Sequence, residues 1–326
     1  MMNYQEYRKF KESIKDQSSL LRLDCMNPFK AMNFMKKVNS TTSPIPESDV
    51  LDLWADKMRV QSLRSVALAS HGVRESLKAL FKYFALQKKE LWLPDDTYPF
   101  YWDAALNSNL RPHGFSTSNA MNLTTLDQAS ANSVVVITNP VSPLGRRLNN
   151  KEINQIKDWL AGSPDRQIVI DTVYDYTSHF DALTLELFET GQCFIAHSLS
   201  KAWLERGIFG VLLTPKKERD TCANLLESPN SEACSSAFNA MEQCPDLPIQ
   251  QQTAFSREWQ RLLPKIQTLA PDFTSPVSGY FSVAKINHEV ALNDFNTLVI
   301  PASVFGSRDS ELSVITCLYD IAKNDH

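Results

Sequence analysis

The stretch Cys193-Phe-Ile-Ala-His-Ser198-Leu-Ser-Lys201 decides the fold, because an apolar run typical of a buried strand ends there in a polar cluster that contains a lysine. Two apolar runs upstream end in the same way. Val134 to Ile137 leads into Asn139-Pro-Val-Ser-Pro-Leu-Gly145, and Ile168 to Ile170 leads into Asp171-Thr-Val-Tyr174. Ligands bind an open parallel sheet at the carboxyl ends of its strands. We therefore expect the three polar clusters to converge on one crevice.

Short apolar runs alternate with helical stretches from about Ser65 to Thr214. This alternation predicts a mainly parallel sheet with right-handed crossovers. One predicted helix runs from Val73 to about Leu86, where apolar residues recur every three or four positions. A second begins at the capped turn Asn149-Asn-Lys-Glu152.

The chain of 326 residues is long enough for one large domain or two moderate ones. Its C-terminal third is rich in helix formers and then in strand-like runs, which predicts an α+β region. We expect a large domain over residues 46–215, and a small domain built from residues 1–45 and 216–326.

Composition excludes several classes of function. A net charge of -4 argues against a nucleic-acid surface, which needs clustered lysine and arginine. No apolar run is long enough to predict a membrane span, and the N-terminus is too polar to predict a secretory signal. The six cysteines are scattered without metal-ligand spacing, so no metal site is expected. A reduced cytoplasmic protein fits this pattern.

Taken in order, the three clusters resemble the pyridoxal-phosphate (PLP) enzymes of the class I/II aminotransferase family, fold-type I. The likeness is to the histidinol-phosphate and aspartate aminotransferase-like enzymes, in an atypical form. It implies an α/β fold with a mainly parallel mixed sheet sandwiched by helices, pyridoxal 5'-phosphate as cofactor, and a homodimer. Lys201 is then the amine that holds the cofactor's aldehyde and moves a proton at the substrate's α-carbon.

Two further residues in the clusters match catalytic positions of the family. Asp171 corresponds to the aspartate beside the cofactor's pyridine nitrogen, where a carboxylate raises the nitrogen's pKa and keeps it protonated. Tyr174 corresponds to the tyrosine that hydrogen-bonds the ring's phenolic oxygen. Tyr98 matches the aromatic side chain that stacks on the ring.

The cofactor's phosphate needs backbone amides at the start of a helix. The turn Ser70-His-Gly-Val-Arg74 supplies this site in the resemblance, with Gly72 and Val73 as amide donors. Ser198 and Arg206 correspond to the hydroxyl and guanidinium that complete the phosphate cup. Arg206 follows Lys201 by five residues, whereas the family's arginine usually follows by eight.

The asparagine-proline motif of the family is altered. Asn139 retains the first asparagine, but Ser142 stands at the second, whose side chain usually reaches the cofactor. A serine hydroxyl is shorter. Both residues are nevertheless expected in the cofactor site.

Substrate binding is where the resemblance is weakest. The segment from Leu23 to Phe29 resembles the one that lines the substrate mouth, with Asn27 as a binding residue. The arginine that grips the substrate's carboxylate has no counterpart, because Leu312 or Ser313 occupies its position. Arg308 lies nearby and is our candidate for the missing contact.

These residues favour an aminotransferase that moves an amino group between an amino acid or amine and a keto acid. The same chemistry also serves lyases, cyclases and decarboxylases, and the missing arginine keeps such a specialised role open. A third alternative is a non-catalytic binding protein of this fold. Retention of Lys201 and Asp171 argues against it.

Overall fold

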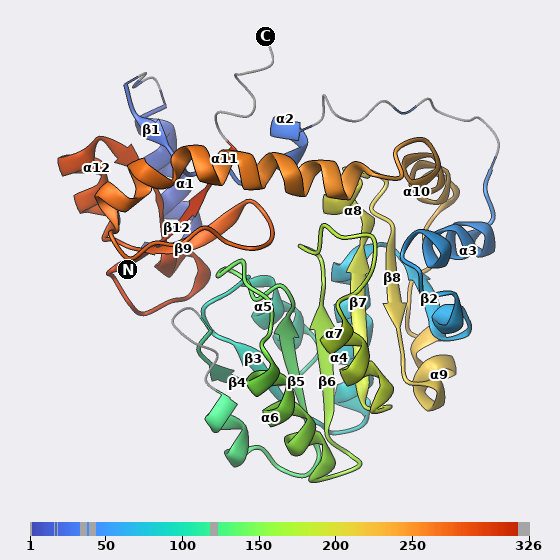
Figure 1. The fold of residues 1–326 in the computed structure, drawn as a ribbon. Helices are drawn as coiled ribbons and strands as arrows, with labels where there is room; N and C mark the ends of the chain where they lie inside the picture. Colours follow the sequence, from blue (N-terminus) through green and yellow to red (C-terminus); the bar gives the residue numbers. More distant parts are fainter. Residues whose placement is uncertain are drawn as a thin grey trace.

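A seven-stranded sheet forms the centre of the computed structural model, which describes residues 2–15, 17, 19–32, 38, 44–117 and 123–318. In spatial order its strands are β2 (Ala67–Ser70), β8 (Gly210–Leu213), β7 (Cys193–Ser198), β6 (Gln167–Asp171), β5 (Ser133–Thr138), β3 (Glu90–Pro94) and β4 (His113–Phe115). Strand β8 runs antiparallel to both neighbours, and the other pairs are parallel (Figure 1). The predicted mixed, mainly parallel sheet is confirmed.

The central strands are buried on both faces. Every residue of β5, β6 and β7 is buried. Alternate side chains of β5 enter separate apolar cores, with Val135 and Ile137 in one and Val134 and Val136 in the other. A strand covered on both faces needs apolar residues at every position, which explains why these segments read as continuous apolar runs.

The pairing register brings the polar clusters to one edge of the sheet. Thr138, the last residue of β5, lies opposite Asp171, and Asp171 lies opposite Ala196 of β7. All three strands are parallel, so the residues that follow them emerge on the same side. The polar clusters therefore converge at one edge of the sheet, beyond the carboxyl ends of β5, β6 and β7, as the sequence predicts.

Helices cover both faces of the sheet (Figure 1). The covering helices are α3 (Glu47–Lys57), α4 (Gly72–Leu86), α5 (Phe100–Asn107), α6 (Asn150–Ala161) and α7 (Ala182–Glu189), and two more, α9 (Arg219–Ala223) and α10 (Ser231–Gln243), pack against α4 and α3. Helices α4 and α5 share a core with Val134, whereas α3, α6 and α7 share the core that contains Val135. The capped start predicted for α6 is confirmed, since Asn149 and Glu152 form a reciprocal capping box.

The two ends of the chain pack together. The N-terminal elements are α1 (Tyr4–Ser13), β1 (Leu21–Arg22) and α2 (Pro28–Met32); the C-terminal ones are β9 (Phe281–Lys285), α12 (His288–Phe295), β10 (Thr297–Leu298), β11 (Ile300–Pro301) and β12 (Leu312–Thr316). Strand β1 pairs with β10, and β12 lies between β11 and β9. The long helix α11 (Leu247–Leu269) spans from this region to the side where α10 lies (Figure 1).

The domain boundary expected at residue 215 stays a prediction. Helix α9 contacts α4, and α10 contacts α3, so residues just beyond that boundary pack beside the helices of the central sheet. Short 3-10 helices connect the remaining elements: η2 (Gln61–Val66), η3 (Leu123–Gln128), η4 (Lys216–Glu218) and η5 (Ala302–Phe305).

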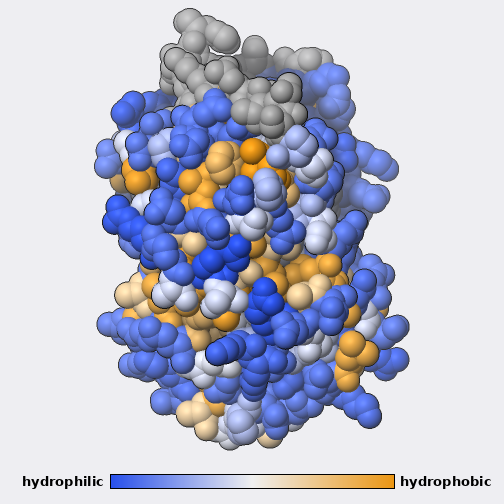
Figure 2. Space-filling model, turned by 90° about the vertical axis from the view of Figure 1, so that its right-hand side faces the viewer, coloured by the Kyte–Doolittle hydropathy of each residue, from blue (hydrophilic) through white to orange (hydrophobic). Residues whose placement is uncertain are grey.

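The face of the molecule seen in Figure 2 is mostly hydrophilic, with a local exception. Figure 2 views the side on which α3, α9 and α10 lie, and shows apolar residues in a band across the middle of that face. Among the described helices, none combines the length and apolar character needed to cross a membrane.

Candidate active site

Lys201 lies in α8 (Leu199–Ala202), a short helix directly after β7. Gln251 of α11 fixes this helix, because its side-chain Nε2 donates to the carbonyl oxygens of Lys201 at 3.1 Å and Ala202 at 2.6 Å. Burial, and then the positive charge of Arg74, lower the pKa of Lys201 to about 8. About a tenth of the amine is therefore neutral at pH 7, and the neutral amine is the form that attacks an aldehyde.

Asp171 is buried at the end of β6, with 4% of its surface exposed. Its Oδ2 accepts a hydrogen bond of 2.7 Å from the hydroxyl of Tyr101, and its Oδ1 accepts one of 2.9 Å from the amide of Val173. Burial raises the pKa of Asp171 to about 6, although both hydrogen bonds act in the opposite direction. The carboxylate is thus held ready for a cationic partner.

Tyr101 is a site residue that the sequence analysis missed. It is buried in α5. Burial raises the pKa of its phenol well above the usual range, and the negative charge of Asp171 raises this pKa further. The sequence signal that could have indicated Tyr101 as a site residue was its position, three residues after Tyr98. Tyr101 lies in the first turn of α5, whereas Tyr98 precedes this helix. The sequence does not reveal that it faces a carboxylate seventy residues away.

Tyr174 and Tyr98 line the same region. The ring of Tyr174 packs edge-on against Phe281 with centroids 4.5 Å apart, and burial raises its pKa to about 12. Tyr98 is 39% exposed and lies edge-on to Tyr101, with centroids 6.2 Å apart. Tyr98 and Tyr174 therefore lie in the surroundings of Asp171, and their contacts with a cofactor stay predictions.

The start of α4 forms a tight turn against β8. Gly72 has φ +81°, and a Cβ on Gly210 would lie 2.7 Å from its Cα. The amides of Gly72 and Val73 belong to the first helical turn, where N–H groups have no intrahelical acceptor. Glycine at both positions permits this close approach and leaves an anion-binding helix start beside the sheet.

The loop between Lys201 and Arg206 is shorter than is usual in the family that the sequence resembles. A buried glutamate holds this loop in place. The Glu205 carboxylate, 0% exposed, accepts hydrogen bonds from the amides of Gly207 and Phe209, the latter at 2.9 Å. Leu204 and Ile208 both have positive φ, a strained state for such side chains. Glu205 is thus a structural residue of the site that the sequence analysis did not identify.

Two cations flank one aromatic ring in the crevice. The ring centroid of Phe29, from α2, lies 5.3 Å from Nζ of Lys201 and 5.9 Å from Cζ of Arg206. The exposed Arg206 is thereby placed near Lys201 despite its altered spacing. Ser198 caps α8, accepting from the amide of Ser200 at 3.2 Å.

The sequence predicts Asn27 as a substrate-binding residue, but in the structure the side chain nearer to Lys201 is that of Phe29. The side chain of Asn27 accepts from the amide of Lys30 at 3.2 Å, so it caps α2. It is Phe29, two residues later, whose ring approaches Lys201. A substrate contact from Asn27 stays a prediction.

The side chain of Asn139 is fully engaged away from Lys201. Its amide nitrogen donates to Asp181 and Thr184, both at 2.8 Å, and its oxygen accepts from the amide of Leu148 at 3.1 Å. The backbone amide of Ser142 donates a hydrogen bond to the side-chain hydroxyl of Thr138 at 2.7 Å. The cofactor contacts expected of Asn139 and Ser142 stay predictions, and the bonds of Asn139 support a structural role.

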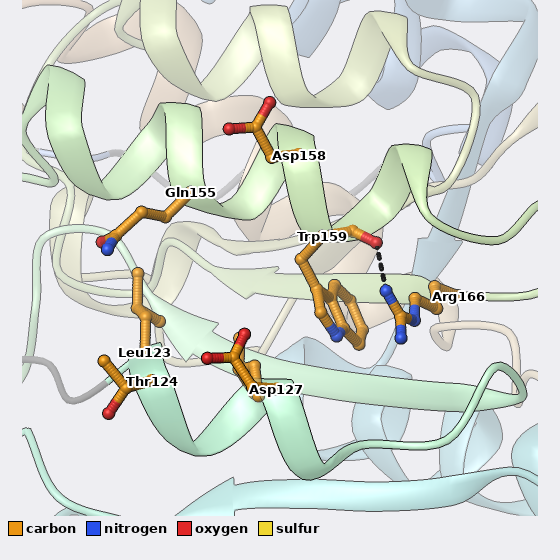
Figure 3. A pocket seen from close by; sticks show the side chains of 8 residues that line it. Leu123, Thr124, Asp127, Gln155, Asp158, Trp159 and Arg166 are labelled. Carbon is orange, nitrogen blue, oxygen red and sulfur yellow. Dashed lines mark hydrogen bonds between the residues drawn. The ribbon is translucent and has the colours of Figure 1, made fainter.

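The hollow drawn in Figure 3 is a separate feature. It has a volume of about 380 Å³ and lies between η3 and α6, where Arg166 donates to the carbonyl of Trp159 at 2.8 Å. Arg166 directly precedes β6, so this hollow lies towards the amino ends of the strands. The polar clusters lie at the opposite end, and the hollow plays no part in their chemistry.

Solved structures with this fold define the class of protein. The aspartate aminotransferase from Rhizobium meliloti matches with a TM-score of 0.75 at 13% identity, over 99% of this chain and 94% of that one. A PLP-bound C-S lyase from Staphylococcus hominis matches with a TM-score of 0.73 at 13% identity, over 99% and 92%. The fold is therefore that of the fold-type I pyridoxal-phosphate enzymes.

Sequence comparison identifies the family. The model described as aminotransferase class I and II matches residues 33–318, and the chain belongs to this family. The histidinol-phosphate aminotransferase of Acinetobacter baumannii (strain AB307-0294) is 32% identical over 110 residues, 34% of this chain and 30% of that protein. That of strain ATCC 17978 is 28% identical over 170 residues, 44% and 46% respectively. The chain thus matches less than half of the length of these relatives.

The residues present fit the family's cofactor, pyridoxal 5'-phosphate. Its aldehyde needs an amine with a lowered pKa, which Lys201 provides. Its pyridinium nitrogen needs a buried carboxylate, which Asp171 provides. Its phosphate needs a helix start with close backbone approach, which the turn at Gly72 provides. When bound, the cofactor withdraws electrons from the substrate's α-carbon.

Proposed function

We propose that this protein is an aminotransferase that moves an amino group between an amino acid or amine and a keto acid. The observation that carries the proposal is the conjunction of Lys201, whose pKa is lowered to about 8, with the buried carboxylate of Asp171 in a chain of this family. A protein that only binds ligands has no physical need to keep both costly buried groups.

Each residue has a defined task in this proposal. The amine of Lys201 would hold the aldehyde of the cofactor and would carry the proton from the substrate's α-carbon. Asp171 keeps the pyridine nitrogen protonated, and Tyr101 fixes the orientation of that carboxylate through their hydrogen bond of 2.7 Å. Tyr174 donates a hydrogen bond to the phenolic oxygen. Tyr98 covers one face of the ring.

The phosphate is bound by the start of α4. Gly72 and Val73 donate their amides, Ser198 offers its hydroxyl, and Arg206 contributes charge from the shortened loop. Glu205 supports this arrangement indirectly. Its carboxylate accepts hydrogen bonds from the backbone amides of Gly207 and Phe209, which hold the loop that carries Arg206.

A lyase is the second candidate function. Two observations favour it: the C-S lyase of Staphylococcus hominis shares the fold, and the buried strand β12 offers no ionisable side chain for a substrate carboxylate. The two functions share Lys201 and Asp171. They differ in the bond that breaks after the α-proton has left.

We further propose a cytoplasmic homodimer. The apolar residues that gather on the face seen in Figure 2 support an association surface there. Sedimentation of the purified chain tests the dimer, which a single species of 36.9 kDa would contradict.

A single-turnover experiment tests the proposed reaction. Protein loaded with pyridoxal phosphate is mixed with individual amino acids in the absence of any keto acid, and the keto acid and ammonia released are measured. Transamination yields at most one equivalent of keto acid per site and no ammonia. Continued release of keto acid with ammonia indicates a lyase. No reaction with any donor, together with no borohydride-trapped cofactor at Lys201, would overturn both.

A further inference from the structure

The C-terminal strand β12 offers no cation to a substrate carboxylate. All five residues of β12 are buried, and none is ionisable. The hydroxyl of Ser313 is already committed, because it donates to the carbonyl of Ile286 at 2.7 Å. If the donor is an amino acid, its carboxylate must meet a cation from another element.

Arg308, our sequence-based candidate, already faces a carboxylate. It is exposed, and its positive charge lowers the pKa of Asp95, whose pKa is nevertheless raised overall by burial and by the neighbouring Asp96. Asp95 directly follows β3, one strand further from Lys201 than β5. The charge of Arg308 is therefore partly offset by a side chain of the protein itself.

Arg74 is placed differently. It lies in the first turn of α4, and its guanidinium donates to the hydroxyl of Tyr98. Its Cζ also lies 5.5 Å from the ring centroids of both Tyr98 and Phe100. The side chain of Arg74 is exposed, and these contacts hold it against the rings of Tyr98 and Phe100. Its positive charge is close enough to lower the pKa values of Lys201 and Tyr174.

This position is electrostatically unfavourable without an anion. A cation at a helix N-terminus meets the positive end of the helix dipole, and Arg74 also lies near the amine of Lys201. No carboxylate forms an ion pair with Arg74 among the residues that the structure describes. The nearest acidic residue on the same helix, Glu75, pairs with Lys78 at 2.5 Å. An incoming anion would relieve the repulsion.

We propose that Arg74 binds the carboxylate of the amino-acid donor, replacing the arginine that β12 lacks. This inference rests on the proposed function. The side chain is directed to Tyr98 and Phe100 at the start of α5, whereas the phosphate site lies at the backbone of Gly72 and Gly210. The guanidinium therefore lies against Tyr98, the side chain proposed to cover the cofactor ring, and not against the backbone of the phosphate turn.

Arg74→Gln tests the proposal, with Arg74→Lys and Lys82→Gln as companions. Lys82 is an exposed cation on α4, about two turns further on, and removing it controls for a change in net charge. Binding of a non-reactive carboxylate, succinate, is followed by the absorbance of the loaded protein. We expect Arg74→Gln to weaken it about tenfold or more, Arg74→Lys to weaken it less, and Lys82→Gln to leave it unchanged.

Kinetics separate carboxylate binding from effects on Lys201. Since Arg74 also lowers the pKa of Lys201, its loss alters the chemical step for every donor. We therefore compare L-alanine with ethylamine, which lacks the carboxylate but uses the same lysine. The KM for alanine should rise about tenfold relative to that for ethylamine in Arg74→Gln. Equal changes for both donors would overturn the proposal.

Two further outcomes would also refute it. A loss of affinity for pyridoxal phosphate in cofactor-free Arg74→Gln, with succinate binding intact, would assign Arg74 to the phosphate. A loss of succinate binding in Arg308→Gln but not in Arg74→Gln would assign the carboxylate to Arg308. Failure of the proposed function is distinguishable, because the wild-type protein itself would then show no cofactor attachment and no turnover.

Discussion

Replacing Tyr101 with phenylalanine removes one hydrogen bond from the buried carboxylate of Asp171. The bond is 2.7 Å long and opposes the effect of burial, which raises the pKa of Asp171 to about 6. A hydrogen bond to a charged group contributes about 1.5–3 kcal/mol. One pKa unit corresponds to about 1.36 kcal/mol. Tyr101→Phe should therefore raise the pKa of Asp171 by a further 1–2 units or so, so that much of it is protonated near pH 7.

The assay is the dissociation constant of pyridoxal phosphate for the cofactor-free protein, measured as a function of pH. Affinity requires ionised Asp171, so it falls as pH falls through the pKa of that carboxyl. In Tyr101→Phe this fall should begin about 1–2 pH units higher than in the wild type. The cofactor's own titrations are common to both proteins and cancel in the comparison.

Tyr83→Phe is the matched control. Tyr83 is also buried, and its hydroxyl also donates to a carboxylate, but that carboxylate is Glu218, outside the site. The control should leave the pH dependence of cofactor affinity unchanged. If Tyr101→Phe behaves like Tyr83→Phe, then Tyr101 does not tune Asp171 and the reasoning is wrong.

The remaining predictions concern three other residues. Attachment of the cofactor to Lys201, followed by absorbance, should accelerate as pH rises through about 8, and Lys201→Ala should show no borohydride-trapped cofactor while keeping its melting temperature. Because Asp171 has a higher pKa in the folded chain than in the unfolded one, the stability of the cofactor-free protein should fall by roughly 3 kcal/mol as pH rises from about 3 to 7. Asp171→Asn should remove this dependence, which thermal melts across that range would reveal. Gly72→Ala should destabilise the fold by about 1–2 kcal/mol or more, measured by urea unfolding, because φ is +81° and the new Cβ would lie 2.7 Å from Ile208.

The fold could be read from the sequence because its signals are local. The apolar runs of β5, β6 and β7 are continuous, as strands buried on both faces require. Parallel strands place their carboxyl ends at one edge, so the positions of Lys201 and Asp171 followed from chain order alone. The family is confirmed by the match over residues 33–318.

Other parts of the site were not predictable from local pattern. Tyr101 reaches Asp171 across seventy residues, and Phe29 of α2 reaches Lys201 from near the N-terminus. Asn139 follows the expected motif, yet its side chain bonds to Asp181, Thr184 and the amide of Leu148. Motif spacing identifies the residue type, but the packing of distant elements selects the partner.

The sequence by itself determined the order of strands and helices, the family, and the two buried groups on which the chemistry depends. The order of elements follows from short-range periodicity and the convergence of the polar clusters from the geometry of parallel strands, whereas the family follows from the resemblance of those clusters to its motifs. Only the tertiary structure decided which cations lie in the crevice, because long side chains such as Arg74 and Arg308 are placed by neighbours far away in the chain. Their roles depend on charge at close range, and that proximity exists only after the elements have packed.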